Sequence, residues 1–294
     1  MTATTAQSAT TKTNKAAFEF VQILAQELSS GKVDLPSFPD IALKVRKVLA
    51  DDNVNLDIVV RVVGSEPALA ARLLQVANSA AVNTTRTTVT DLRKAVQRIG
   101  LNMVRSAAMA FAMAQMKKSS ELKGLEAPMA SLWQRCTSVA AMAHVVARRL
   151  SKVNPDSALL AGLLHGVGEL YILTRAHRHP ALFSDRPAYE QIVRDWHISV
   201  AKALLENWEI SEDIVKAIGE FEDLDRTHTG PADLSDVLTV AQLLVSYQDY
   251  PESIELNMQG VSARKRMAMD GTSYSNLILE SRDEIKELQE ALGA

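Results

Sequence analysis

His165 lies in an apolar segment, where a histidine side chain is either packed in the core or used for chemistry. It lies in the segment GLLHGVGEL (residues 162–170), inside an apolar run over residues 156–173. A histidine there is either buried with a hydrogen-bond partner or bound to a metal, and the first is commoner because most buried polar groups find ordinary partners. A helix that used this imidazole for metal chemistry would want a carboxylate beside it, but the next residue is Gly166. Glu169 falls one helical turn later, on the same face.

The elements that must position His165 are expected to be helices. Apolar residues recur mostly at spacings of three and four, and the chain has only 12 glycines and 9 prolines. This pattern predicts an almost wholly helical chain. A long helix is expected over about residues 129–150, and Asn154 and Pro155 then start the helix that bears His165. Ser211 is expected to cap another helix further on.

Helix boundaries are also readable in the first half of the chain. A first helix is expected over residues 16–29. Ser65, Glu66 and Pro67 together predict a helix start, with the serine as the cap and the proline in the first turn. Gly100 is expected to end one helix before the next begins. These segments supply apolar faces for an N-terminal helical core.

Composition and charge narrow the function classes. Hydrophobic residues make up 47% of the 294 residues, the net charge is −3, and Cys136 is the single cysteine. The balance is that of a globular protein, with no overall attraction to nucleic acid, and one cysteine suits a cytoplasmic location. No uninterrupted apolar run reaches ~18 residues, so no membrane span is predicted. Residues 1–14 lack the apolar core of a secretory signal and are expected to form a disordered tail.

Several blocks of the sequence resemble the HDOD family, the "HD-related output domain" of bacterial signalling proteins. The similar region runs from about Leu35 to Glu222. It implies an all-α, two-lobed fold, in which an N-terminal helical bundle packs on a lobe related to HD-type metal-dependent phosphohydrolases. The blocks that carry the resemblance are LPSFPDIALKVRKVL, SEPALAARLLQVANSA, TVTDLRKAVQRIGLNMVRS and GLLHGVGEL.

The resemblance also implies a domain organisation. Residues 15–252 are expected to form the HDOD domain, with an N-terminal helical lobe over 15–124 and a degenerate HD-like lobe over 125–252. Residues 253–294 are expected to add a C-terminal helical extension. Its last segment carries a narrow apolar seam, which either folds back on the core or pairs with another copy in a homodimer.

The resemblance allows the metal ligands of active HD-type hydrolases to be compared with this chain position by position. Those enzymes hold divalent metals with histidines and aspartates from several helices, and the metals activate a bound water. Here His165 and His197 match ligand histidines. The other positions differ: Cys136 or Ser138 near the first histidine, Gly166 for the bridging aspartate, Glu220 and Phe221 at a further histidine, and Gln242 near the late aspartate.

Two neutral imidazoles leave a hard divalent cation without the carboxylates that it needs for charge and geometry. We therefore expect no catalytic residues, no bound metal and no other cofactor. The expected function is that of a non-catalytic signal-transduction or regulatory protein that acts through contacts with signalling proteins. Nucleic acid and membranes are not expected partners.

A rebuilt metal site is the alternative hypothesis. Cys136, His165, Glu169, His197 and Glu220 together would suit zinc, which binds thiolate, imidazole and carboxylate ligands. The chain would then be a metal-dependent phosphohydrolase of nucleotides or cyclic dinucleotides with an altered ligand set.

Overall fold

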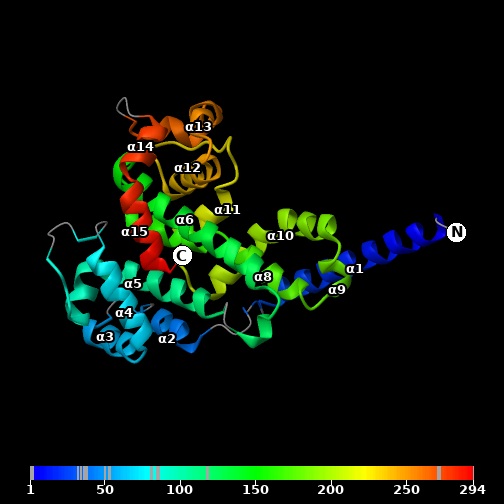
Figure 1. The fold of residues 1–294 in the computed structure, drawn as a ribbon, viewed down its shortest axis with the longest axis horizontal. Helices are drawn as coiled ribbons and strands as arrows, with labels where there is room; N and C mark the ends of the chain where they lie inside the picture. The colour runs from blue at the N-terminus through cyan, green and yellow to red at the C-terminus, as the bar shows by residue number, and fades with distance from the viewer. Residues whose placement is uncertain are drawn as a thin grey trace.

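The structure, a computed structural model, confirms the prediction of an all-α fold. Helices and short 3-10 turns connected by loops make up the described chain, in which no strand occurs (Figure 1). The residues that the structure describes are 3–31, 33, 35, 39–49, 51, 54–79, 82–83, 87–116, 119–269 and 273–293.

Four helices form the N-terminal bundle: α2 (Asp40–Leu49), α3 (Leu56–Gly64), α4 (Pro67–Asn78) and α5 (Leu92–Met116). Gly100 bends α5 with a φ of 74°, so the predicted helix end is a kink between two helical halves. Glycine suits this position because residues with a Cβ rarely adopt positive φ.

The start of α4 is predicted correctly, but its cap is not. The N-cap residue is Glu66, and it makes no capping hydrogen bond through its side chain. Ser65 instead ends α3, where its hydroxyl donates to the carbonyl of Val62 at 2.6 Å. The connection between α3 and α4 is so short that the serine serves the preceding helix.

The second lobe is built around α6 (Glu126–Leu150), which follows a short turn, η1 (Ser120–Leu122). Its alanine-rich sequence lets neighbouring helices approach closely, and α7, α12 and α15 all pack against it. The other helices of this lobe are α7 (Pro155–Leu164), α8 (Val167–Ala176), α9 (Pro180–Phe183), α10 (Arg186–Asn207), α11 (Glu212–Glu220) and α12 (Leu234–Tyr247).

The segment Pro155–Ala176, which holds α7 and α8, is long and apolar enough to cross a membrane by length and composition. Within the protein, however, 89% of its apolar window is buried. Its composition therefore matches the position that it occupies in the core of the second lobe.

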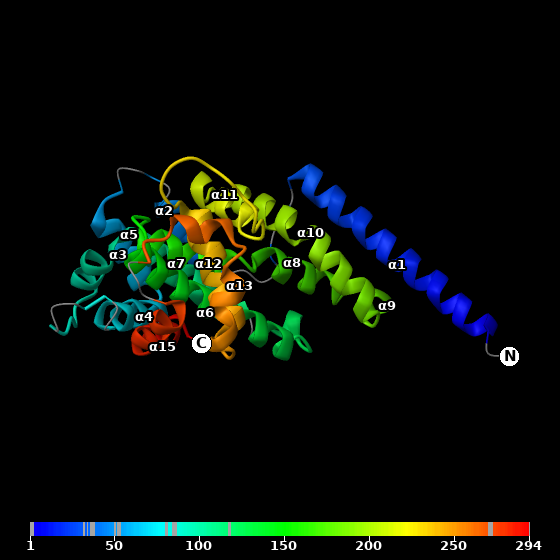
Figure 2. The ribbon, with the colours of Figure 1, turned by 90° about the horizontal axis from the view of Figure 1, so that it is seen from above.

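The first helix differs from the prediction in length and in place. It spans Ala3–Ser30, so residues 3–14 continue the helix and do not form the predicted disordered tail. This segment contains neither glycine nor proline, the two residues that most disfavour helix. Although it was assigned to the N-terminal lobe, α1 packs mainly against α9 and α10 (Figure 2). Phe20 and Leu24 are buried in this contact.

The C-terminal extension folds back on the chain. Its last helix, α15, packs on α6 and also contacts α4 and α5, so it bridges the two lobes (Figure 1). The seam residues Leu288 and Leu292 are buried. Trp133 Nε1 donates to the carbonyl of Gly293 at 3.0 Å. The homodimer stays a prediction. The elements of the extension are α13 (Pro251–Met258), η2 (Ser262–Arg266), α14 (Tyr274–Glu280) and α15 (Arg282–Leu292).

Candidate functional site

A pocket of about 180 Å³ opens beside His165, where the junction of α7 and α8 meets α6, α10, α11 and α12. We call it the His165 pocket. Three of the five residues of the hypothetical zinc site contribute to its wall. The lining residues are Arg135, His165, Gly166, Glu169, Val193, Arg194, His197, Phe221, Glu222 and Gln242.

His165 was predicted to lie within a helix, but it lies at the end of one. It is the C-cap residue of α7, and α8 begins only at Val167. The side chain is 4% exposed, and Nδ1 lies 2.6 Å from the carbonyl oxygen of Gly162. Since a carbonyl only accepts, Nδ1 carries the proton and Nε2 carries a lone pair. Burial lowers the pKa of His165 to about 4, so the ring is neutral at pH 7.

The other ring nitrogen of His165 is left without a partner. Nε2 is buried, and no described residue forms a hydrogen bond with it. The ring of Phe221 meets the imidazole edge to face, with 5.8 Å between the ring centroids. An unpaired buried nitrogen is uncommon in a folded protein and is a reason to ask what binds there.

Gly166 is glycine because of crowding. Its φ of −89° is open to any residue, but a Cβ at this position would lie 2.7 Å from Sγ of Cys136 and 2.9 Å from Cδ1 of Leu132. The place where the side chain of an aspartate would begin is thus filled by α6. Cys136 is fully buried, and burial raises the pKa of its thiol to about 12. The thiol is therefore protonated at pH 7 and packs beneath the pocket.

Glu169 reaches the pocket from the first turn of α8, but its carboxylate already has a partner. It forms an ion pair with the guanidinium of Arg135 on α6. Both side chains are partly exposed, at 30% for Glu169 and 41% for Arg135. The pair closes one side of the pocket with charges that cancel.

His197 enters the pocket from α10, which lies unusually close to α8. A Cβ on Gly168 would lie 1.9 Å from the carbonyl oxygen of His197, so only glycine permits this approach. The imidazole Nε2 is 3.3 Å from Oε2 of Glu222. A hydrogen bond from this ring holds the pKa of Glu222 below its usual value.

Glu220 is not in the wall of the pocket, although it was predicted to be a candidate ligand. Its carboxylate accepts hydrogen bonds from Arg226 Nε at 2.7 Å and from Ser235 Oγ at 3.0 Å. Phe221 and Glu222 line the pocket instead. The sequence AIGEFED offers acids on both sides of Phe221, and without the fold nothing chooses between them.

Gln242 occupies the position that was matched to the late aspartate, and it does reach the pocket. Its amide oxygen Oε1 is buried and has no hydrogen-bond partner among the described residues. Two side chains of the pocket wall therefore carry an unpaired buried acceptor, Oε1 of Gln242 and Nε2 of His165.

A second cluster of acids and histidine, which sequence reasoning missed, surrounds Asp236 at the start of α12. Asp236 is 1% exposed, and its carboxylate accepts from Arg266 at 2.6 Å, from His228 at 2.8 Å and from Arg226 at 3.1 Å. Asp233 pairs with Arg226 as well. We call these residues, together with Glu220, the Arg226 network. The sequence separations of up to 40 residues explain why no local pattern revealed it.

The Arg226 network contains ligand types that could hold a metal. Ligand atoms of His228, Asp233 and Asp236 lie within 4.8 Å of one another. The guanidinium groups of Arg226 and Arg266, however, already supply the positive charge that a cation would bring. The cluster is a structural ion network.

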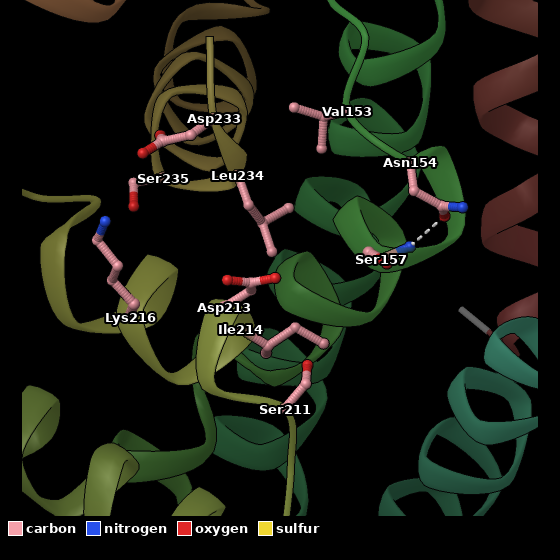
Figure 3. A pocket seen from close by; sticks show the side chains of 10 residues that line it. All are labelled: Val153, Asn154, Ser157, Ser211, Asp213, Ile214, Lys216, Asp233, Leu234 and Ser235. Carbon is pink, nitrogen blue, oxygen red and sulfur yellow. Dashed lines mark hydrogen bonds between the residues drawn. The ribbon is translucent and has the colours of Figure 1, made fainter. Parts of the chain in front are cut away.

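A larger hollow of about 320 Å³ lies where the N-terminal ends of α7, α11 and α12 approach one another (Figure 3). Helix N-termini favour anions, and Lys216 lines the same hollow. The carboxylates of Asp213 and Asp233 share this space and oppose an anion (Figure 3). The hollow therefore carries no net preference for a phosphate group.

The HDOD domain family matches residues 35–224. The chain belongs to the HDOD family. This confirms the resemblance found in the sequence. An uncharacterized protein of Treponema pallidum (strain Nichols) is 22% identical over 241 residues, which is 77% of this chain and 45% of that protein. The HDOD chain thus spans less than half the length of this relative.

Solved structures of bacterial proteins share the fold. A Shewanella amazonensis protein, provisionally named a metal-dependent phosphohydrolase, is 23% identical with a TM-score of 0.75, over 95% of this chain and 99% of that one. An HDOD domain protein of unknown function from Geobacter sulfurreducens is 24% identical with a TM-score of 0.63, over 96% and 98%. A Marinobacter aquaeolei protein, provisionally named a signal transduction protein, is 19% identical with a TM-score of 0.56, over 89% and 60%.

Proposed function

We propose that this HDOD protein is a non-catalytic signalling or regulatory protein that acts through protein–protein contacts. Its HD-like lobe then serves as a scaffold that has lost phosphohydrolase chemistry. The family and the likeness to a protein provisionally named for signal transduction support the regulatory role.

The packing around Gly166 is the observation that carries the proposal. A bridging carboxylate at this position would need space that Cys136 and Leu132 fill. Because protein interiors are packed as densely as organic crystals, such a side chain cannot be added without moving α6 or its side chains. Position 166 therefore lacks both the carboxylate and the space for one.

The remaining donors in the His165 pocket fit a hydrolytic metal centre poorly. Glu169 is paired with Arg135, and His197 with Glu222. The Cys136 thiol is protonated, whereas a zinc ligand is a thiolate. A cation would have to break these pairs and would then find one buried imidazole that is already free.

Metal-dependent turnover tests the proposal. The full chain is assayed with bis(p-nitrophenyl) phosphate and p-nitrophenyl phosphate in the presence of Mn²⁺, Mg²⁺ or Zn²⁺. We expect wild type, His165→Ala and His197→Ala to give the same background rate. Metal-stimulated turnover that either substitution abolishes would overturn the proposal.

A metal-dependent phosphohydrolase with altered ligands is the second candidate. The observation that favours it is the unpaired Nε2 of His165, with the imidazole of His197 in the same pocket. The same assay decides between the two candidates, because only the second predicts turnover that needs both histidines.

A further inference from the structure

Two side chains that line the His165 pocket each carry a buried acceptor without a donor among the described residues. Nε2 of His165 holds a lone pair because Nδ1 carries the proton that is donated to Gly162. Oε1 of Gln242 is the second acceptor. Buried acceptors in native proteins nearly always have a partner, and so we expect a group that supplies N–H or O–H donors beside these two atoms.

The other polar groups in the pocket do not supply these donors. The guanidinium of Arg135 is directed at Glu169, and that of Arg194 donates to the side-chain oxygen of Gln191 at 2.8 Å. The His197 ring faces Glu222. These N–H groups are directed at other acceptors, and the formal charges of the two carboxylates and the two arginines cancel.

An anion is disfavoured by this arrangement, because its oxygens would meet the lone pairs of His165 and Gln242. A group with several N–H donors and a positive charge is favoured, since hydrogen bonds that involve a charged partner are the stronger ones. The volume of about 180 Å³ limits the group to the size of a side-chain head, well below the ~300–1,000 Å³ of pockets for drug-sized ligands.

We propose that the His165 pocket binds a primary ammonium or guanidinium group, with Nε2 of His165 and Oε1 of Gln242 as its acceptors. The group belongs either to a small amine or to a lysine or arginine of a protein partner. This inference rests on the proposed function, because a catalytic metal would occupy the same lone pair of His165.

The spacing of the side chains favours an N–H donor over a metal ion. Zinc needs ligand atoms at about 2.1 Å on several sides, which brings those atoms close to one another. Among the described residues, three His, Cys, Asp or Glu ligand atoms come within 4.8 Å of one another only in the Arg226 network. N–H donors reach acceptors at about 2.9 Å in directions of their own, so they satisfy more widely spaced atoms.

The test follows the ¹⁵N resonance of His165 Nε2 while the full chain is titrated with n-propylammonium or methylguanidinium. Tetramethylammonium is the control probe, because it has the charge without an N–H donor. We expect a saturable shift with at least one of the two N–H probes and none with tetramethylammonium. No shift with either N–H probe, or an equal shift with tetramethylammonium, would overturn the inference.

Two glutamine variants locate the site. Gln242→Leu removes the second acceptor but leaves the buried ring of His165 in place, and it is expected to weaken binding by roughly tenfold or more. Gln248→Leu, an exposed position just after the same helix, is the matched control and is expected to bind as wild type does. Equal affinity of Gln242→Leu and wild type would contradict the proposed contact.

A further titration distinguishes a protein partner from a small amine as the source of the N–H group. A capped tripeptide with a central lysine that binds more tightly than n-propylammonium assigns the pocket to a protein partner, and the reverse assigns it to a small amine. If no N–H probe binds and the chain hydrolyses no phosphoester, only this inference is contradicted. If the chain binds stoichiometric Zn²⁺ through His165 and hydrolyses a phosphoester, the proposed function is contradicted as well.

Discussion

The His165 pocket lies within the second lobe, whereas the Arg226 network joins that lobe to the C-terminal extension. Both regions contain arginines, histidines and acids, but they differ in how their polar atoms are paired. In the network, Asp236 and Asp233 meet two guanidinium groups and an imidazole. In the pocket, two buried acceptors have no donor. Clustered acids and histidines therefore do not by themselves identify a binding site.

The two regions also differ in what they connect. The network ties the loop after α11 to the C-terminal extension, because Arg266 comes from η2 and the backbone N–H of Ser262 donates to Leu224 at 2.9 Å. The pocket joins helices that are already held by close packing at Gly166 and Gly168. We expect mutations in the network to affect stability and mutations in the pocket to affect binding.

The largest effect is expected from Asp236→Ala. It leaves the largely buried guanidinium of Arg266 without its carboxylate partner, which costs about 3–5 kcal/mol in the free energy of unfolding, whereas Arg226 keeps Glu220 and Asp233. Urea unfolding measures the loss. Asp225→Asn, an exposed acid in the same loop, is the control and is expected to stay within about 0.5 kcal/mol. A loss below 1 kcal/mol for Asp236→Ala would place the network among ordinary surface ion pairs.

The His165 pocket and the Arg226 network are expected to lose stability in different pH ranges. Burial lowers the pKa of His165 from 6.5 to about 4, so between these values the unfolded chain binds a proton that the folded chain does not. Stability falls as the pH falls through this range, by about 3 kcal/mol in total. Burial gives His144 a pKa of about 4 and the same sign. We expect His165→Gln to remove about half of the slope that the two rings produce in urea unfolding between these pH values.

Asp236 responds below that range. Burial alone would raise its pKa, but hydrogen bonds from Arg266 and His228 outweigh burial and hold the pKa below the usual 3.8. Its contribution to stability is therefore present above pH 3.8 and is lost only as the pH falls further.

If the slope of stability between pH 6.5 and 4 is unchanged in His165→Gln, the assignment of that pH range to the pocket is contradicted.

Gly166→Ala tests the closed position beside His165. The added Cβ must displace Cys136 or Leu132, and overpacking of this kind costs about 1–3 kcal/mol. Cys136→Ala in the same chain opens the space, so the double variant is expected to lose less than the sum of the two single losses. Gly260→Ala, where nothing lies within 4 Å of the added Cβ, is the control. Strict additivity would show that the two positions do not touch.

The smallest effect is expected from Glu169→Gln. Its ion pair with Arg135 is partly exposed, and such pairs contribute less than about 1 kcal/mol. The exposed pair of Glu190 with Arg186 on α10 provides the control, Glu190→Gln. Urea unfolding of both variants is compared with wild type. A loss above 2 kcal/mol for Glu169→Gln alone would mean that the carboxylate has a structural role that its exposure does not indicate.

The sequence predicts the helices and the burial of His165 because both follow from local apolar spacing. It also places His197 and Gln242 correctly beside His165, through the family resemblance. It misses Glu222 because helical phase alone does not tell which acid in AIGEFED turns inward. It misses the pairing of Asp236 with Arg266 because that contact spans 30 residues and depends on where the C-terminal extension lands.

The metal content of the purified chain tests the central claim most directly. Protein prepared without chelator and then exposed to Zn²⁺ and Mn²⁺ is desalted and analysed for bound metal, with His165→Ala and His197→Ala alongside. Wild type is expected to retain far less than one metal ion per chain, and no more than the two variants. Close to one tightly held ion per wild-type chain, lost in both variants, would contradict the claim that the pocket no longer holds a catalytic metal.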